Sequence, residues 1–216
     1  MNSSLNIKRF VTNPIGENCY LIWDETRECA IIDCGAWEED KEMKIVHFIE
    51  ENQLLPRYAL QTHMHFDHVL GLHFLHRRYG LNPMCHVLEQ PVYEFVPTMV
   101  RDWFGMQVEE PLVPVLEYLT DGQEIQLGHS RIRVLFTPGH TPGGLCFFVP
   151  DDKILFSGDT LFQGSVGRTD FPGGNAETLF HAIRTKIFTL DADVKVYPGH
   201  GPATTVGDEQ RFNPYL

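Results

Sequence analysis

Long apolar runs are missing from this sequence of 216 residues. No stretch approaches the ~18 consecutive apolar residues that a transmembrane helix needs, so we expect no association with a membrane. The first ten residues also lack the positively charged start and apolar continuation of a signal peptide. Basic residues are scarce, since 17 Lys and Arg stand against 29 Asp and Glu, which gives a net charge of −12. Without a local basic stripe, such a chain repels phosphate backbones, which argues against nucleic acid as a partner.

Cysteine is sparse as well, and no two of the five cysteines form a Cys-x-x-Cys pair. An odd and scattered set argues against both a disulfide framework and a thiolate zinc site. We therefore expect small buried thiols in a protein of the reducing cytoplasm. The cysteines are Cys19, Cys29, Cys34, Cys85 and Cys146. Histidine, in contrast, is abundant, with 11 residues.

The length fits one domain, because a single core grows to ~250–300 residues before a chain usually divides. Hydrophobic residues make up 43% of the chain and charged residues 21%, as in globular proteins. Short apolar runs between turn residues predict strands at 5–11, 18–23, 29–33, 57–62, 131–136, 145–149, 153–156 and 194–197. Helical spacing predicts helices at 37–52, 69–79 and 176–188. Strands that alternate with helices, without a long linker, predict a single α/β domain over residues 1–216.

The segment Glu89–Val108 is rich in aromatic residues and is interrupted by Pro97 and Gly105. We interpret it as one or two short helices. Two roles are open at this point: a cover over a functional site, or ordinary packing against the core.

The segment from residue 62 to residue 68 holds the densest group of ligand-type side chains, His63, His65, Asp67 and His68. It begins where a predicted strand ends, and it ends where a predicted helix begins. His63 and His65, two residues apart, can converge on one ion from an extended loop. Asp67 and His68 lie beyond the turn and can face a neighbouring position. Burying such groups together is costly without a cation, so this segment indicates a metal site.

Three further residues, His140, Asp159 and His200, share one placement. Each follows a predicted strand through a short link that contains Gly, which allows a tight turn. Ligands at the carboxyl ends of strands commonly form the active site of an open α/β sheet. Seven nitrogen and oxygen donors at four strand ends, without a cysteine, predict a site for two metal ions.

The pattern His63-x-His65-x-Asp67-His68, followed by His140, Asp159 and His200 in this order, resembles the metallo-β-lactamase superfamily. Within it, the chain is similar to the glyoxalase II group, the hydroxyacylglutathione hydrolases, and to their short bacterial type. The closer match lies in GDTLF at 158–162, GRTDFP at 167–172, GHGP at 199–202 and FNPYL at 212–216. The resemblance covers nearly the whole chain. It implies a four-layer αββα sandwich with the metals at one edge of the two sheets.

The resemblance also implies a role for each ligand. The first metal ion would be bound by His63, His65 and His140. The second would be bound by Asp67, His68 and His200, and Asp159 would bridge both. Asp33 would either orient a ligand histidine or form a turn. A shell of nitrogen and oxygen donors suits zinc, and it also suits iron or manganese.

Two such ions would lower the pKa of a bridging water, deliver hydroxide at neutral pH and polarise the scissile carbonyl. Asp67, beside that water, would accept its proton in addition to binding metal. The resemblance thus implies a binuclear hydrolase of small thioesters, with S-lactoylglutathione or a related hydroxyacyl thioester as substrate. The commonest β-lactamase subclass carries a cysteine where Asp159 stands, so the aspartate favours the hydrolase branch.

Arg168 matches a basic position that anchors glutathione in the family, and its planar fork suits a substrate carboxylate. Alternatively, it forms an ion pair with Asp170, which replaces a tyrosine of the family. Gly201-Pro202 also replaces an expected aromatic residue. Longer members add a C-terminal helical region that helps to hold glutathione, and we expect this region to be missing here. These departures leave open which thioester is the natural substrate.

Three other functions are alternatives to the thioester hydrolase. A persulfide dioxygenase of the same fold would use one iron ion, held by His63, His140 and Asp159, with open positions for oxygen. An interaction module with structural metals is disfavoured, because closed structural sites avoid so many open-position histidines and carboxylates. A nuclease is disfavoured by the negative charge.

Overall fold

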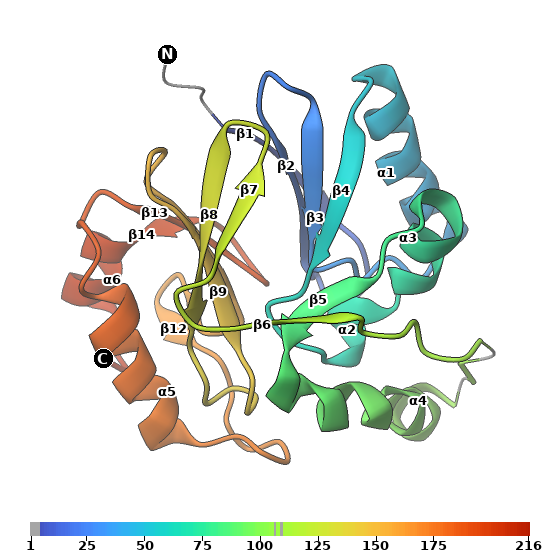
Figure 1. Ribbon diagram of the computed structural model, residues 1–216. Helices are drawn as coiled ribbons and strands as arrows, with labels where there is room; N and C mark the ends of the chain where they lie inside the picture. The colour runs from blue at the N-terminus through green and yellow to red at the C-terminus, as the bar shows by residue number, and fades with distance from the viewer. Residues whose placement is uncertain (1–4, 106, 109) are drawn as a thin grey trace.

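Two six-stranded sheets face each other in the centre of the molecule, and helices cover the outer face of each sheet (Figure 1). This computed structural model describes residues 5–105, 107–108 and 110–216. The layer order is therefore helix, sheet, sheet, helix, and the predicted αββα sandwich is confirmed. No helix in the described part of the chain is long and apolar enough to cross a bilayer.

The first half of the chain forms one sheet in which the strand order follows the sequence. β1–β3 are antiparallel, and β3–β6 run parallel to one another. The strands are β1 (Asn6–Val11), β2 (Asn18–Trp23), β3 (Glu28–Ile32), β4 (Leu55–Leu60), β5 (Pro83–His86) and β6 (Glu117–Leu119). The helices are α1 (Glu39–Glu51), α2 (Phe66–Val69), α3 (Leu72–Tyr79), the 3-10 turn η1 (Val87–Glu89) and α4 (Gln90–Phe104).

The second half forms a sheet of order β14-β13-β10-β9-β8-β7. Its neighbours are antiparallel except for β10 and β13. The strands are β7 (Glu124–Leu127), β8 (Ser130–Phe136), β9 (Leu145–Val149), β10 (Ile154–Gly158), β13 (Lys195–Pro198) and β14 (Thr204–Thr205), with a separate hairpin of β11 (Leu161–Phe162) and β12 (Ser165–Val166). The helical segments are α5 (Ala176–Ala182), the π turn η2 (Ile183–Ile187) and α6 (Val206–Phe212).

The central strands are buried on both faces, and their side chains divide between two clusters by alternation. In β2, Tyr20 and Ile22 lie in the cluster between the sheets, whereas Cys19 and Leu21 pack under the helices. A third cluster joins the outer face of the second sheet to α5 and α6. Three apolar layers thus hold four layers of secondary structure, and the loops at the sheet edges remain free to carry polar groups.

Two helices differ from the prediction. The single helix predicted at 69–79 is two helices, α2 and α3, because the chain breaks at Gly71. Gly71 donates its N–H to the Cys34 carbonyl at 2.8 Å, and a Cβ there would lie 2.8 Å from the same oxygen. The helix predicted at 176–188 changes from α to π geometry after Ala182. There Thr185 donates its hydroxyl to the carbonyl of His181, which competes with the regular helical bond.

The segment Glu89–Val108 contains one long helix, α4, which continues through Pro97. One face of α4 is buried in the core through Tyr93, Val96, Met99 and Val100, as ordinary packing requires. Met106, near the end of the segment, lies outside the described residues.

Candidate metal centre

The loop between β4 and α2 presents the first four ligand-type side chains. His63 and His65 lie on the loop itself, and Asp67 and His68 lie in the first turn of α2. His65 keeps extended backbone angles and forms the N-cap of α2, so the chain turns immediately after it. As expected from the sequence, the two histidines and the Asp67-His68 pair come from different local structures.

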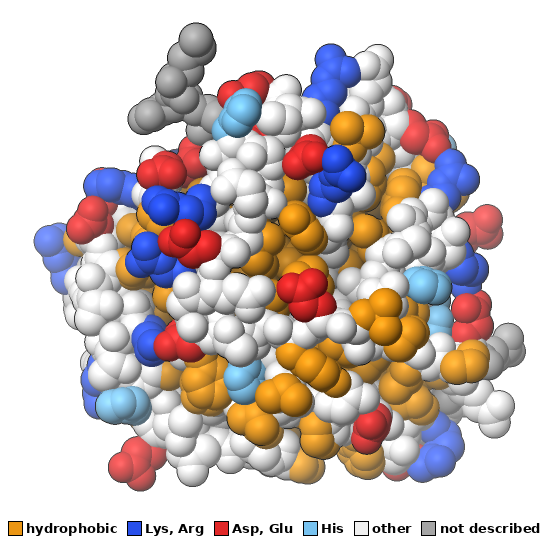
Figure 2. Space-filling view, in the orientation of Figure 1, with side chains coloured by type: hydrophobic (Ala, Val, Ile, Leu, Met, Phe, Trp, Pro, Cys, Tyr) orange, Lys and Arg blue, Asp and Glu red, His pale blue; other side chains and the backbone are white. Residues whose placement is uncertain are grey.

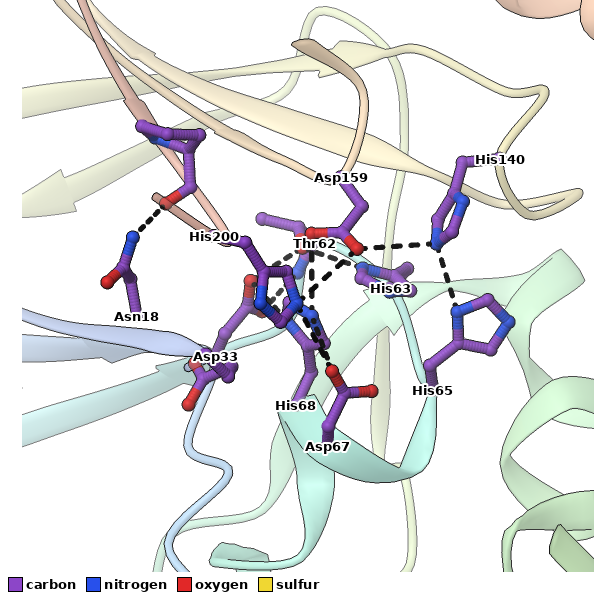
Figure 3. A network of polar contacts seen from close by, with 12 residues as sticks. Asn18, Asp33, Thr62, His63, His65, Asp67, His68, His140, Asp159 and His200 are labelled. Atoms are coloured by element: carbon purple, nitrogen blue, oxygen red, sulfur yellow. Dashed lines mark hydrogen bonds and ion pairs between the residues drawn. The ribbon is translucent and has the colours of Figure 1, made fainter. Parts of the chain in front are cut away.

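The other three side chains come from the second sheet, and each lies after a strand. His140 follows β8, Asp159 follows β10 directly, and His200 follows β13. Gly199 is required beside His200, because a Cβ there would lie 2.8 Å from Cε1 of His68 and closer still to Asp159. Figure 3 shows the side chains from both sheets pointing toward one another.

Six of the seven side chains form two adjacent groups. In the first group, the ligand atoms of His63, His65 and His140 lie within 4.8 Å of one another. In the second group, the same holds for Asp67, His68 and His200. Six of the seven residues that the sequence predicted as ligands are thus brought to one place.

Asp159 lies between the two groups. Its Oδ2 is 3.7 Å from Nε2 of His140 in the first group. The same oxygen is 3.6 Å from Nε2 of His200 in the second group. Its Oδ1 is 3.5 Å from Nε2 of His68. One carboxylate therefore faces histidines of both groups.

Several buried polar atoms in this centre lack a hydrogen-bond partner among the described residues. They include His63 Nε2, His68 Nε2 and Asp159 Oδ1. Unpaired buried polar atoms are costly and call for an explanation such as an ion. The donors are imidazole nitrogens and carboxylate oxygens, which divalent metal ions bind readily. The residues therefore fit the divalent metal ions that the fold implies.

The histidines of the first group are held in the neutral form. Burial lowers the pKa of His65 to about 3 and the pKa of His63 well below its ordinary value, and neighbouring histidines add to both effects. Burial also lowers the pKa of His140, although Asp159 opposes the change. A neutral imidazole keeps a nitrogen lone pair for a metal ion.

The second group carries more negative charge. Burial opposes protonation of His68, but Asp67, Asp159 and Asp33 together raise its pKa well above the ordinary value. Burial likewise opposes ionisation of Asp67, yet His68 and His200 lower its pKa. Asp67 Oδ2 is 3.2 Å from His200 Nε2, so this group is partly satisfied by its own ion pairs.

Asp33, directly after β3, contacts His68 and the neighbouring residue Thr62. Its carboxylate accepts hydrogen bonds from the Thr62 N–H at 2.7 Å and from the Thr62 hydroxyl at 2.6 Å. Its Oδ2 also lies 3.1 Å from Nδ1 of His68, as expected for a residue that orients a ligand histidine. The Thr62 hydroxyl is in turn 3.1 Å from Nδ1 of His63.

Sequence reasoning missed several supporting groups. His140 Nδ1 lies 2.7 Å from the carbonyl oxygen of Arg168, so a main-chain group orients this histidine. Asn18 of β2 donates its side-chain amide to the carbonyls of Pro198 and Gly201, on both sides of His200. A main-chain contact carries no residue-type pattern, and the only sequence hint was the Asn at the start of a predicted strand.

Arg168 lies at the rim of the centre. Its guanidinium donates two hydrogen bonds of 2.7 Å to Asp170, so the ion pair weighed as its alternative role is present. The same guanidinium lies 3.8 Å from the ring centre of Phe171, whose ring packs at 5.4 Å against that of His65. The end of α4 reaches this rim, because the ring of Trp103 lies 5.5 Å from that of Phe171.

Hydrophobic side chains also reach the surface beyond this rim. Figure 2 shows them among charged groups on the face that carries β6 and α4. The large exposed hydrophobic residues described in these elements are Phe95, Trp103 and Phe104 of α4 and Tyr118 of β6, and those beside them are Val87, Leu88 and Leu116. α4 thus both packs into the core and borders the centre.

Known proteins are similar to this chain in sequence and fold. The metallo-β-lactamase superfamily profile matches residues 12–200. Hydroxyacylglutathione hydrolase GloC of Haemophilus influenzae is 36% identical over 213 residues, which cover 98% of each chain. The crystal structure of TTHA1623 in a di-iron-bound form is 36% identical, covers 97% of this chain and 100% of that chain, and superposes with a TM-score of 0.85. The crystal structure of BLEG-1 B3 metallo-β-lactamase is 31% identical, covers 98% and 99%, and gives a TM-score of 0.84. The chain belongs to the metallo-β-lactamase superfamily, and its architecture is that of a metal-dependent hydrolase.

Proposed function

We propose that this protein hydrolyses small thioesters, S-lactoylglutathione or a related hydroxyacyl thioester, with two divalent metal ions. The observation that carries the proposal is the position of Asp159, 3.5–3.7 Å from histidines of both ligand groups. A carboxylate in this position suits a bridge between two ions. The similarity to hydroxyacylglutathione hydrolase GloC supports the choice of a thioester.

The proposed ligands follow the two groups. His63, His65 and His140 would hold one ion, Asp67, His68 and His200 the other, and Asp159 would contact both. The donors suit zinc first, with iron or manganese as alternatives. The di-iron-bound form of TTHA1623 supports keeping iron among them.

When bound, two such ions would activate a water molecule and polarise the thioester carbonyl. Asp67 would also act on the attacking water, and this role depends on its ionisation state. Because His68 and His200 lower its pKa against the effect of burial, Asp67 stays ionised. It can therefore accept a hydrogen bond from the attacking water and orient its lone pair, and it is the group to which the proposal assigns the proton of that water.

Arg168 would hold the far end of the substrate. Its side chain is exposed at the rim and its guanidinium already makes a planar pair with the Asp170 carboxylate. A substrate carboxylate offers the same geometry, so it can compete with Asp170 for this fork. The ring of Phe171 contacts both the Arg168 guanidinium and the His65 ring. It would therefore place the group that binds the substrate carboxylate on the same side of the centre as the metal ligand His65.

The alternative of a persulfide dioxygenase needs only His63, His140 and Asp159. It leaves Asp67, His68 and His200 without a task, although these three are gathered as closely as the first group. The completeness of the second group therefore favours the hydrolase.

The test is turnover without oxygen. The zinc-loaded protein should hydrolyse S-lactoylglutathione at the same rate in air and under strict anaerobiosis, and it should consume no oxygen with glutathione persulfide. His68→Ala should lower kcat/KM for the thioester by about 10²–10⁴-fold, because one ion and its stabilisation of the oxyanion are lost. His181→Ala, an exposed histidine on α5, serves as the control and should change nothing. Stoichiometric oxygen uptake with the persulfide, unaffected by His68→Ala, would refute the hydrolase.

A further inference from the structure

Glu89 is a buried carboxylate near the centre that belongs to neither ligand group. It is the last residue of η1, directly before α4, and its exposed fraction is 0%. Oε2 accepts a hydrogen bond of 2.7 Å from the N–H of Met64. Oε1 accepts a hydrogen bond of 2.8 Å from the N–H of Gly143. One carboxylate therefore joins two chain segments that lie far apart in the sequence.

These two segments carry the first ligand group. Met64 lies between His63 and His65, and Gly143 lies three residues after His140. Glu89 thus holds the loop of the first sheet to the loop of the second sheet at the point where three imidazoles must converge. The second group is supported elsewhere, by Asp33 at His68 and by the β2 contacts beside His200.

The contact at Gly143 has no room to spare. A Cβ on Gly143 would lie 2.8 Å from Cγ of Glu89 and 2.9 Å from its Oε1, which is tighter than side chains tolerate. Burial raises the pKa of Glu89, and the Thr141 side chain and the N–H groups of Met64 and Gly143 act against this shift. A buried carboxylate is costly unless its oxygens are paired, and here each oxygen has a main-chain donor.

We infer that Glu89 is a positioning residue that assembles the first metal site, by clamping the His63–His65 loop and the His140 loop together. The inference rests on the proposed assignment of His63, His65 and His140 to one ion. Partners of metal ligands typically contribute 10–100-fold to metal affinity. Loss of the clamp should therefore weaken the first site by about this factor and leave the second site as it is.

Two variants disturb the clamp from opposite sides. Glu89→Gln keeps the shape, but its amide nitrogen must face one of the two N–H donors, so one loop is released. Gly143→Ala keeps the carboxylate and pushes the His140 loop away from it. Each is made in a His200→Ala background, in which the first site is the tighter one and its Kd is measured, and in a His140→Ala background, in which the second site is measured.

The measurements are Zn²⁺ affinity by competition with a chromophoric chelator and the visible absorption spectrum of the Co²⁺-loaded protein. We expect both variants to raise the first-site Kd by about 10–100-fold, to alter the Co²⁺ spectrum of that site and to leave the second-site Kd within about 2-fold. Glu94→Gln, exposed on α4, is the surface control. Glu209→Gln is the buried control, because Glu209 also accepts a main-chain bond, from Gly164 at 2.9 Å, and lies on α6. It should lower the melting temperature without changing the first-site Kd.

The outcomes separate this inference from the proposed function. If the parent protein binds no Zn²⁺ at either site, the ligand assignment itself fails. If it binds two ions and Glu89→Gln leaves the first-site Kd within about 2-fold, the clamp is wrong while the assignment stands. If both sites weaken equally, as from general loosening, Glu89 has only a structural role and the inference is overturned.

Discussion

The two ligand groups lie side by side but are built by different means. The first consists of three buried histidines whose pKa values are lowered by burial. The second combines Asp67 with two histidines, whose pKa values nearby carboxylates raise against the effect of burial. Asp159 faces both groups.

The supports of the two groups differ in the same way. His140 is oriented by the carbonyl of Arg168, and the loop of His63 and His65 is held through the N–H of Met64. His68 is instead held by the Asp33 carboxylate. The first group is thus fixed largely through main-chain groups, and it contains no carboxylate of its own. The second is fixed by charge and contains the Asp67 carboxylate beside the shared Asp159, so it should hold a cation better after the loss of a ligand.

The largest expected effect comes from removing one ligand from each group. His140→Ala leaves two neutral imidazoles and only the shared Asp159 carboxylate in the first group, so its ion should be lost on dialysis. His200→Ala leaves Asp67 and Asp159 beside His68, so a weakly held second ion should persist. Elemental analysis should give close to two ions for the parent protein, one for His140→Ala and between one and two for His200→Ala.

Both variants should lower kcat/KM for the thioester by at least about 10²-fold, because either loss removes an electrostatic stabiliser of the transition state. His181→Ala is again the neutral control. A parent protein that holds one ion, with no second ion at any metal concentration, would contradict the assignment of the second group. Equal metal loss in the two variants would remove the contrast between the groups.

A smaller effect should distinguish the residues that position the two ligand groups. Asp33→Asn removes the carboxylate behind His68, so the second-site Kd should rise about 10–100-fold. Thr62→Val keeps that carboxylate and removes only the hydroxyl between Asp33 and His63, so it should affect the first site more. Zn²⁺ competition in the His140→Ala background measures the second site, and in the His200→Ala background the tighter of the two constants belongs to the first site. If Asp33→Asn weakens the first site more than the second, the proposed division of supports is wrong.

The ligand residues could be predicted because their chemistry is local. His63, His65, Asp67 and His68 lie within six residues, and His140, Asp159 and His200 each follow a strand closely. The fold followed from the same motif and from the alternation of strands and helices. Strands such as β5 and β6 were missed because three or four residues are too few to show a period, and β5 begins with a proline.

The supporting groups could not be predicted, because they act through tertiary contacts. Glu89 is 25 positions from Met64 and 54 from Gly143, and it binds their main-chain N–H groups. Neither partner has a side chain that would reveal the contact. The Arg168 carbonyl that orients His140 is equally invisible, since every residue type has this group. A sequence therefore reveals metal ligands more readily than the groups that position them.

The smallest expected effect concerns Arg168. It tests whether the main-chain carbonyl of this residue supports the first group while its side chain binds the substrate. Its carbonyl holds His140, whereas its side chain pairs with Asp170 and lies over Phe171. Arg168→Ala keeps the carbonyl, so metal content and the first-site Kd should stay unchanged. If the side chain binds a substrate carboxylate, KM for S-lactoylglutathione should rise by about 5-fold or less, as for an exposed ion pair. KM for an uncharged thioester should stay constant.

Asp170→Asn, the matched variant, frees the guanidinium and should lower KM for the charged substrate. Equal changes for both substrates would assign the Arg168 side chain to its ion pair alone, and lost metal would show that it also supports His140.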